Sequence, residues 1–316
     1  MKISIVMATY NGEKYLAKQL YSILKQSRKA EEVLIFDDGS KDRTAEIIQK
    51  FIEKNNLKTS WFFEKNSSNK GCTRNFLDGI QKSNGDLIFY CDQDDIWEVD
   101  KLEIMEKCFL ERQETVACFC RRIYIDANGK VMHPRFLFMS EPKWKRVQFQ
   151  KLNLNESVKY NKSPGLCLAF KRELVPEIYN LALENKLTHD LPVGMIASVK
   201  NGYYVVNKRL VRYRQHSQNI STPQLTFSSR ISKLDFQLLG RKERYRQMVA
   251  IYKTYYGQLN ARQQRNFLRA IQTTQKSIKY MKERNIVRLF LEIFNCNPMI
   301  NNWILINNFV CCLMNR

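Results

Sequence analysis

Strand-like and helix-like segments alternate over residues 3–102, and this alternation constrains the fold more than any other feature of the sequence. The apolar runs at residues 3–7 and 87–91 have the length and composition of buried strands. Segments with apolar residues at helical spacing, such as residues 13–26, separate the strands. The alternation predicts an α/β fold with a parallel sheet and helical crossover connections.

A cluster of carboxylates follows the apolar run 87–91 directly and contains Asp92, Asp94 and Asp95. Carboxylates this close repel one another unless they share a cation or hydrogen-bond donors. Their oxygens suit Mg²⁺ or Mn²⁺, and open α/β sheets bind ligands at the carboxyl ends of their strands. The sequence therefore predicts a metal and phosphate site at this point.

Five motifs in sequence order resemble the family 2 glycosyltransferases over about residues 1–220. They are Ala-Thr-Tyr-Asn-Gly at 8–12, Asp-Asp-Gly-Ser at 37–40, Lys-Gly followed by Arg-Asn within 70–75, Asp-Gln-Asp-Asp-Ile-Trp at 92–97, and His-Asp at 189–190. The acidic motif is most similar to that of bacterial rhamnosyltransferase-type enzymes of surface polysaccharide synthesis. The resemblance implies the GT-A nucleotide-diphospho-sugar transferase fold, a mostly parallel sheet flanked by helices.

The resemblance also implies that a UDP- or dTDP-linked sugar binds along these strand ends. Tyr10 would stack on the base, and Asp38 would accept a hydrogen bond from it. Arg74, at the start of a helix, would lie near the phosphates. Simpler roles stay open for these residues. Tyr10 would then only fill the edge of the sheet at a strand end, residues 37–40 would form a turn that caps the next helix, and Arg74 would be a solvated surface residue. The residues expected to bind the nucleotide-sugar are Ala8, Thr9, Tyr10, Asp38, Lys70, Gly71, Arg74, Asp92 and Gln93.

The same resemblance assigns the metal ligands. Asp92 would lie near the ribose and the metal, and Asp94 would bind the metal directly. His216 occupies a place where many GT-A enzymes have a histidine near the metal or diphosphate, although a structural role is equally open. Mg²⁺ or Mn²⁺ would neutralise charge on the departing nucleotide. Asp95 would either tune the site or cap a helix expected to begin near residue 97.

Asp190 is the expected catalytic base, because transfer with inversion needs a group that takes the proton from the acceptor hydroxyl. The alternative is a cap for the following helix, which has Pro192 in its first turn. His189 is expected to shape the acceptor site, and Gly165 to let the sugar or acceptor approach the backbone.

The C-terminal third is strongly basic. The chain has a formal net charge of +21, and residues 225–316 contain 16 Lys and Arg against 4 Asp and Glu. We place the catalytic domain at residues 1–222 and a helical, basic region at 223–316. This region is expected to rest on an anionic membrane surface, or alternatively only to pack on the catalytic domain. No nucleic-acid motif is present, so a nucleic-acid partner is not expected. The expected interfacial anchors are Trp303, Ile304, Leu305, Ile306, Phe309 and Val310.

These features predict a metal-dependent, inverting glycosyltransferase that adds one sugar to a hydroxyl of a lipid-linked saccharide acceptor, in capsule, O-antigen or cell-wall polysaccharide synthesis. The N-terminus does not resemble a signal peptide, and no apolar stretch reaches about 18 residues, so a cytoplasmic location on the inner face of the cell membrane is expected. A processive enzyme is not expected, since Gln-x-x-Arg-Trp is missing. The alternatives are an inactive GT-A scaffold and a sugar nucleotidyltransferase, although the latter would need a Gly-rich, basic loop after the first strand.

Overall fold

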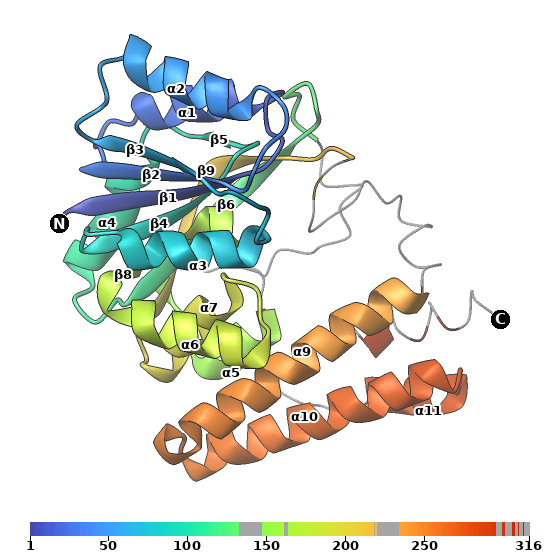
Figure 1. Cartoon of the computed structure of the whole chain (residues 1–316). Coiled ribbons are helices and arrows are strands. Elements are labelled where there is room, and N and C mark those ends of the chain that lie inside the picture. Colours follow the sequence, from blue (N-terminus) through green and yellow to red (C-terminus); the bar gives the residue numbers. More distant parts are fainter. Residues whose placement is uncertain are drawn as a thin grey trace.

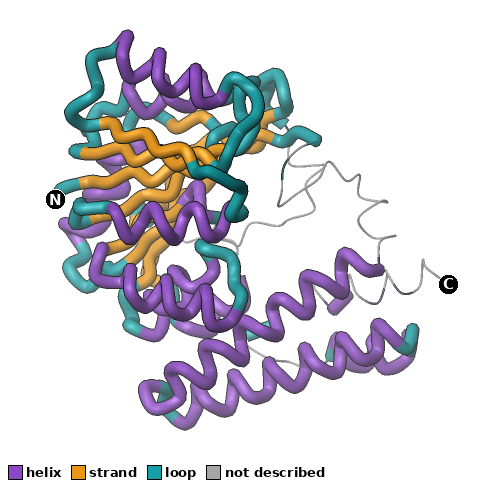
Figure 2. Tube along the Cα trace, in the orientation of Figure 1, coloured by secondary structure: helices purple, strands orange, loops and turns teal. Residues whose placement is uncertain are grey.

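The computed structural model describes residues 1–132, 147–160, 164–217, 219, 234–294, 299–300, 305–306, 309 and 312. These residues contain a nine-stranded sheet with helices on both faces, as Figures 1 and 2 show. The predicted α/β class is therefore confirmed.

The first half of the sheet is parallel, with strand order β3-β2-β1-β4 and a helix in each crossover, as the sequence predicts. Its elements are β1 (Ile3–Thr9), α1 (Leu16–Leu24), β2 (Glu32–Asp37), α2 (Thr44–Lys54), β3 (Trp61–Lys65), α3 (Cys72–Lys82) and β4 (Leu87–Asp92).

The second half of the sheet is mixed. β8 pairs antiparallel with both β4 and β6, β9 runs parallel to β6, and β5 and β7 pair antiparallel with β9. The elements are β5 (Ile96–Trp97), α4 (Lys101–Glu111), β6 (Ala117–Ile125), β7 (Phe149–Lys151), α5 (Leu154–Tyr160), β8 (Leu168–Lys171), α6 (Val175–Asn185), α7 (Leu191–Val199) and β9 (Tyr203–Arg214). The sequence predicts a helix over residues 101–112, and α4 confirms it; a start of this helix near residue 97 is wrong, since Ile96–Trp97 is a strand.

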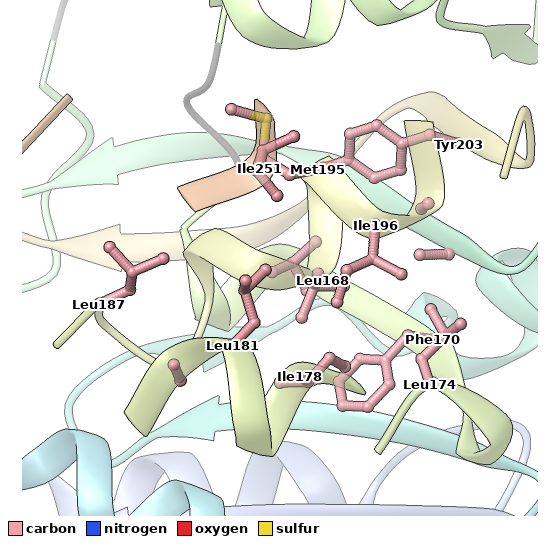
Figure 3. Packing of buried hydrophobic residues seen from close by; sticks show 14 of the residues in the cluster. Leu168, Phe170, Leu174, Ile178, Leu181, Leu187, Met195, Ile196, Tyr203 and Ile251 are labelled. Carbon is pink, nitrogen blue, oxygen red and sulfur yellow. The ribbon is translucent and has the colours of Figure 1, made fainter. Parts of the chain in front are cut away.

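The core lies in two layers, one on each face of the sheet. Alternate residues of β1 face opposite layers: Ile5 packs with α1, α2 and α4, whereas Val6 packs with α3, α6 and α7. Figure 3 shows the second layer, where Phe170 of β8 and Ile178 of α6 pack together. Because both faces are covered, the central strands are mostly apolar, with polar residues chiefly at their ends.

Three helices follow the sheet: α9 (Leu234–Tyr255), α10 (Ala261–Lys282) and α11 (Ile286–Ile293). α9 and α10 lie side by side below the sheet layers in Figure 1. Ile251 of α9 and Phe267 of α10 are buried in the same core layer as α6 and α7, so these helices pack on the face of the sheet domain that α6 and α7 cover. The predicted boundary at 222/223 lies outside the described residues.

The structure tests only some of the expected membrane anchors. Leu305 is buried in the core layer shared with α6 and α7, so it is not available to a membrane. Phe309 packs against Phe290 of α11, with ring centroids 5.4 Å apart, and Trp303, Ile304 and Val310 lie outside the described residues. No helix in the described part of the chain is long and apolar enough to cross a membrane.

Candidate functional site

The register of the central strands brings the predicted site residues together. β1 lies between β2 and β4, and its last residues pair Ala8 with Asp92 and Thr9 with Asp37. The Thr9 hydroxyl also donates a hydrogen bond to the buried Asp37 carboxylate at 3.1 Å. The carboxyl ends of three parallel strands therefore meet at one edge of the sheet, where α/β proteins bind ligands.

The loop after β1 is held by Gln93. The backbone N–H of Tyr10 donates to Gln93 Oε1 at 2.9 Å, and Gln93 Nε2 donates to the Tyr10 carbonyl at 3.0 Å. A Cβ on Gly12 would lie 2.2 Å from Gln93 Oε1, so Gln93 also needs a glycine there. The side chain of Tyr10 is left 43% exposed, which suits the predicted stacking on a base.

Asp38 holds the loop that precedes α3. Its buried carboxylate accepts hydrogen bonds from the backbone N–H groups of Lys70 and Gly71, both at 2.8 Å, and from Asn66 Nδ2 at 3.0 Å. Gly71 has φ of 87°, a conformation that favours glycine. The alternative role of residues 37–40 as a helix cap is wrong, because Arg43 occupies the cap position of α2 without a side-chain hydrogen bond.

The two cations expected near the phosphates are engaged elsewhere. Lys70 Nζ and Arg74 Nε both form ion pairs with Asp78 of α3, at 3.3 and 2.7 Å. The Arg74 guanidinium also lies 5.5 Å from the ring centroid of Tyr179. Both side chains are more than 40% exposed, so these ion pairs are weak and the side chains are free to exchange them for a phosphate.

The three carboxylates after β4 have different surroundings. The Asp92 carboxylate accepts no side-chain or backbone hydrogen bond from the described residues, and burial together with the charges of Asp94 and Asp190 raises its pKa to about 8. Asp94 Oδ2 lies 2.7 Å from His216 Nε2. Asp95 is fully buried and accepts a hydrogen bond from a backbone N–H of β9, while burial raises the pKa of its carboxyl well above the ordinary range.

Arg214 and Tyr15 support the Asp94–His216 pair, and sequence reasoning assigned neither a role. Arg214 is fully buried and donates from Nε to the Asp94 carbonyl at 2.8 Å and from Nη1 to the Ala127 carbonyl at 3.2 Å. Its guanidinium lies 4.8 Å from the Tyr15 ring centroid, and that ring lies 4.8 Å from the imidazole of His216. The position of Arg214 two residues before His216 was the only sequence signal.

The residues expected to bind a metal fit a divalent cation in part. Among the described residues, no three His, Cys, Asp or Glu side chains form a ready metal-binding group. Asp94 and His216 do present adjacent oxygen and nitrogen donors, and a cation would relieve the repulsion that raises the pKa of Asp92. Mg²⁺ commonly binds through one or two carboxylates together with substrate phosphates, which matches an incomplete protein site.

Asp190 is the N-cap residue of α7, directly before Leu191. Its Oδ1 accepts a hydrogen bond from the Thr188 hydroxyl at 2.7 Å, its Oδ2 accepts one from the Gly165 N–H at 3.2 Å, and its side chain makes no capping hydrogen bond to α7. Asp190 therefore occupies the cap position of the alternative, but its carboxylate does not cap the helix. His189 is buried with its ring stacked 4.1 Å from Phe76, and burial lowers the pKa of its imidazole.

Cys72 is a further residue at this edge that sequence reasoning missed. It begins α3 directly after the loop that Asp38 holds, and it is exposed. Partial desolvation of the thiol raises the pKa of Cys72, and so do the charges of Asp92 and Asp190. The start of α3 therefore lies near Asp92, at the end of β4, and near Asp190, directly before α7.

Comparison with known proteins agrees with this arrangement. A family model described as Glycosyl transferase family 2 matches residues 4–179. The dTDP-rhamnosyl transferase RfbG of Shigella flexneri is 27% identical over 261 residues, 77% of this chain and 82% of that protein. An uncharacterized glycosyltransferase of Haemophilus influenzae is 40% identical over 101 residues, 32% of this chain and 39% of that protein. The chain thus spans well under half the length of the first curated relatives it matches.

Two solved structures share the fold. Staphylococcus aureus TarS 1-349 in complex with UDP-GlcNAc has a TM-score of 0.61 at 20% identity, covering 96% of this chain and 83% of that one. The mannosyltransferase PcManGT of Pyrobaculum calidifontis, with GDP-Man and Mn²⁺, has a TM-score of 0.54 at 13% identity, covering 99% and 86%. With the GT-A fold in common and the family match spanning more than half of the 316 residues, the chain belongs to glycosyl transferase family 2.

Proposed function

We propose that this protein transfers one sugar from a nucleotide-diphospho-sugar to an acceptor hydroxyl, with inversion at the anomeric carbon. The observation that carries the proposal is the set of hydrogen bonds made by the Asp190 carboxylate, together with its place near Asp92. Its carboxylate is held by Gly165 and Thr188 instead of capping α7, and it is close enough to Asp92 for its charge to raise the pKa of that residue. A carboxylate held beside a nucleotide site, yet free of a structural role in its own helix, is suited to general-base catalysis.

In the proposed reaction, Asp190 accepts the proton of the acceptor hydroxyl as the hydroxyl oxygen bonds to the anomeric carbon. The bond between that carbon and the phosphate oxygen breaks, and the nucleoside diphosphate leaves. The hydrogen bonds from Gly165 and Thr188 fix the carboxylate, so that little reorientation is needed during the transfer.

Asp92, Asp94 and His216 are the proposed ligands of Mg²⁺ or Mn²⁺. A bound cation would neutralise charge on the departing diphosphate. Arg214 binds the backbone of Asp94, and Tyr15 packs against both Arg214 and His216. These contacts favour metal binding because fewer side chains must be ordered when the cation binds.

The donor is proposed to be a dTDP- or UDP-linked sugar. Support comes from RfbG, named as a dTDP-rhamnosyl transferase, and from TarS, whose structure is described as a complex with UDP-GlcNAc. Tyr10 is proposed to stack on the base. Among the described residues, Asp38 Oδ2 accepts a hydrogen bond from Gly71 alone, and so keeps a lone pair for the base.

A thermal-shift screen tests donor and metal together. dTDP-rhamnose, UDP-GlcNAc and GDP-mannose are each added with and without MnCl₂. A donor at 100 times its Kd stabilises the folded state by about 2.7 kcal/mol. We expect one of the first two donors to raise the melting temperature, with a further rise from Mn²⁺ that Asp94→Ala abolishes. The proposal fails if no nucleotide-sugar shifts the transition, or if Mn²⁺ acts equally on Asp94→Ala.

We further propose that the protein works on a lipid-linked saccharide in polysaccharide synthesis, peripherally on the inner face of the cell membrane. The support is α11, where Val287, Phe290, Leu291 and Phe294 recur at helical spacing and are between 45% and 70% exposed. The neighbouring helix α10 is rich in Lys and Arg and has no Asp or Glu. An exposed apolar stripe beside a basic helix suits an anionic lipid surface.

Vesicle flotation tests the membrane surface. The double variant Leu291→Ser/Phe294→Ser is compared with wild type on vesicles of phosphatidylglycerol and phosphatidylcholine. Leu110→Ser is the matched control, because Leu110 is 60% exposed on α4 in the catalytic domain. We expect wild type and the control to float with anionic vesicles only, and the double variant to stay in solution. Equal flotation of all three proteins would exclude α11 as the membrane surface.

A further inference from the structure

Lys101, the first residue of α4, is a fully buried cation. Lysine is almost never fully buried without a partner, because desolvating an ammonium costs several kcal/mol. Its Nζ donates to the Leu166 carbonyl at 2.7 Å and lies 3.4 Å from the ring centroid of Trp97. Among the described residues this ammonium forms no ion pair, and burial lowers the pKa of Lys101 although the charge of the buried Asp95 carboxylate acts in the opposite direction. A plain stabilising role does not explain so costly an arrangement.

The Leu166 carbonyl belongs to the short 3₁₀ turn Gly165–Cys167, which lies directly before β8. The N–H of Gly165, one residue earlier in the same turn, donates to Asp190 Oδ2 at 3.2 Å. A Cβ on Gly165 would come within 2.8 Å of His189 Nε2, so the turn packs tightly against the residue before Asp190. The ammonium and the Asp190 carboxylate thus hold adjacent residues of one turn.

We propose that Lys101 is a positioning residue for Asp190: it fixes the Leu166 carbonyl, and through it the Gly165 N–H that orients the carboxylate. The inference rests on the proposed role of Asp190 as the base. Lys101 also connects the acidic segment that contains the proposed metal ligands with the turn that holds the proposed base. It belongs to the helix that follows the acidic segment, and its ammonium is packed on Trp97 at the end of that segment. A shift of the acidic segment is therefore transmitted to the turn that holds the base.

The variant Lys101→Met removes the donor while it keeps an unbranched side chain of similar length. Displacing a catalytic group by about 1 Å costs up to roughly 100-fold in rate, so we expect kcat for dTDP-rhamnose turnover to fall about 10- to 100-fold. The Kd for dTDP-rhamnose, measured by calorimetry, should stay within about threefold of wild type, because Lys101 forms no hydrogen bond or ion pair with a residue assigned to the nucleotide and its charge acts on Asp92 only as a minor influence. Lys101→Gln should retain more of kcat, since its amide still offers a donor to Leu166.

Lys107→Met is the matched control, because Lys107 lies on the same helix with its side chain 53% exposed. Wild-type kcat is expected for this variant. A merely structural lysine would instead weaken kcat and donor affinity together, and that result for Lys101→Met would overturn the proposal. If Lys101→Met does not fold, Lys101→Gln carries the same comparison.

A double-mutant cycle separates the inference from the proposed function. If Lys101 acts through Asp190, Lys101→Met should change kcat less than twofold in an Asp190→Ala background. An effect as large as in the wild-type background would refute the positioning role and leave the proposed function intact. If Asp190→Ala alone turns over dTDP-rhamnose at the wild-type rate, the proposed base is wrong and the inference falls with it.

Discussion

Replacing Asp92 with Asn tests whether the acidic segment is strained when no cation is bound. Burial, with the charges of Asp94 and Asp190, raises the pKa of Asp92 from the ordinary 3.8 to about 8. A carboxyl group whose pKa is higher in the folded than in the unfolded state destabilises the fold as pH rises between the two values. Asp92 should therefore reduce stability progressively from about pH 4 to about pH 8.

The size of the effect follows from the shift. At about 1.4 kcal/mol per pKa unit, the change from 3.8 to about 8 gives an upper bound of about 6 kcal/mol at pH 8. Asp92 keeps some contact with water, and effective dielectric constants near such groups are about 20, so we expect about 2–3 kcal/mol. Asn has nearly the same shape and no charge, so Asp92→Asn should raise the melting temperature at pH 8 by about 5 °C. The gain should vanish near pH 4.

The assay is thermal unfolding followed by circular dichroism from pH 4.5 to 8.5, with EDTA present to remove divalent cations. Asp126→Asn is a control of opposite sign, because backbone hydrogen bonds, chiefly from Lys130, lower the pKa of Asp126. Relative to wild type, Asp126→Asn should become less stable as pH rises above about 4, because the variant lacks the carboxylate that the backbone N–H groups stabilise. A gain for Asp92→Asn that does not depend on pH, or a loss at pH 8, would refute the reasoning.

Three further predictions concern contacts that the structure makes explicit. Asp38→Ala removes the acceptor of the Lys70 N–H and one of the two acceptors of the Gly71 N–H, which also donates to Asn69 Oδ1, and should lower the free energy of unfolding in urea by about 1–3 kcal/mol; an unchanged midpoint would show that the loop is held otherwise. Gly12→Ala places a Cβ where Gln93 packs and should weaken calorimetric donor binding about tenfold, the loss of roughly one hydrogen bond; unaltered affinity would contradict the clamp. Tyr255→Phe removes a hydrogen bond of 2.6 Å to Glu177 and should cost about 1 kcal/mol in urea unfolding; no loss would argue against docking of α9 on α6.

The parallel half of the sheet could be predicted because β1, β2 and β4 are mostly apolar segments separated by helices of clear period. The mixed half could not, since the position of β8 between β4 and β6 depends on pairing between distant segments. The helix placed near residue 97 illustrates this: Trp97 pairs with Val211 of β9, and nothing in the local sequence signals that contact.

The site shows the same division. The motifs indicated which residues gather at the strand ends, because their place after each strand is a local property. The contacts made by individual side chains could not be predicted from the sequence, since they join segments that are distant in the chain. Gln93 binds the backbone of Tyr10 from 83 positions away, and Lys101 reaches a carbonyl 65 positions away.

The central claim is that Asp190 is the base of a sugar transfer, and the rate of dTDP-rhamnose turnover by Asp190→Asn tests it most directly. Asn keeps the shape of Asp190 and cannot accept the proton at neutral pH. General-base catalysis contributes about 10²- to 10⁴-fold, so kcat should fall by that factor while the calorimetric Kd for the donor stays within about threefold. A kcat within about twofold of wild type, at unchanged donor affinity, would contradict the account.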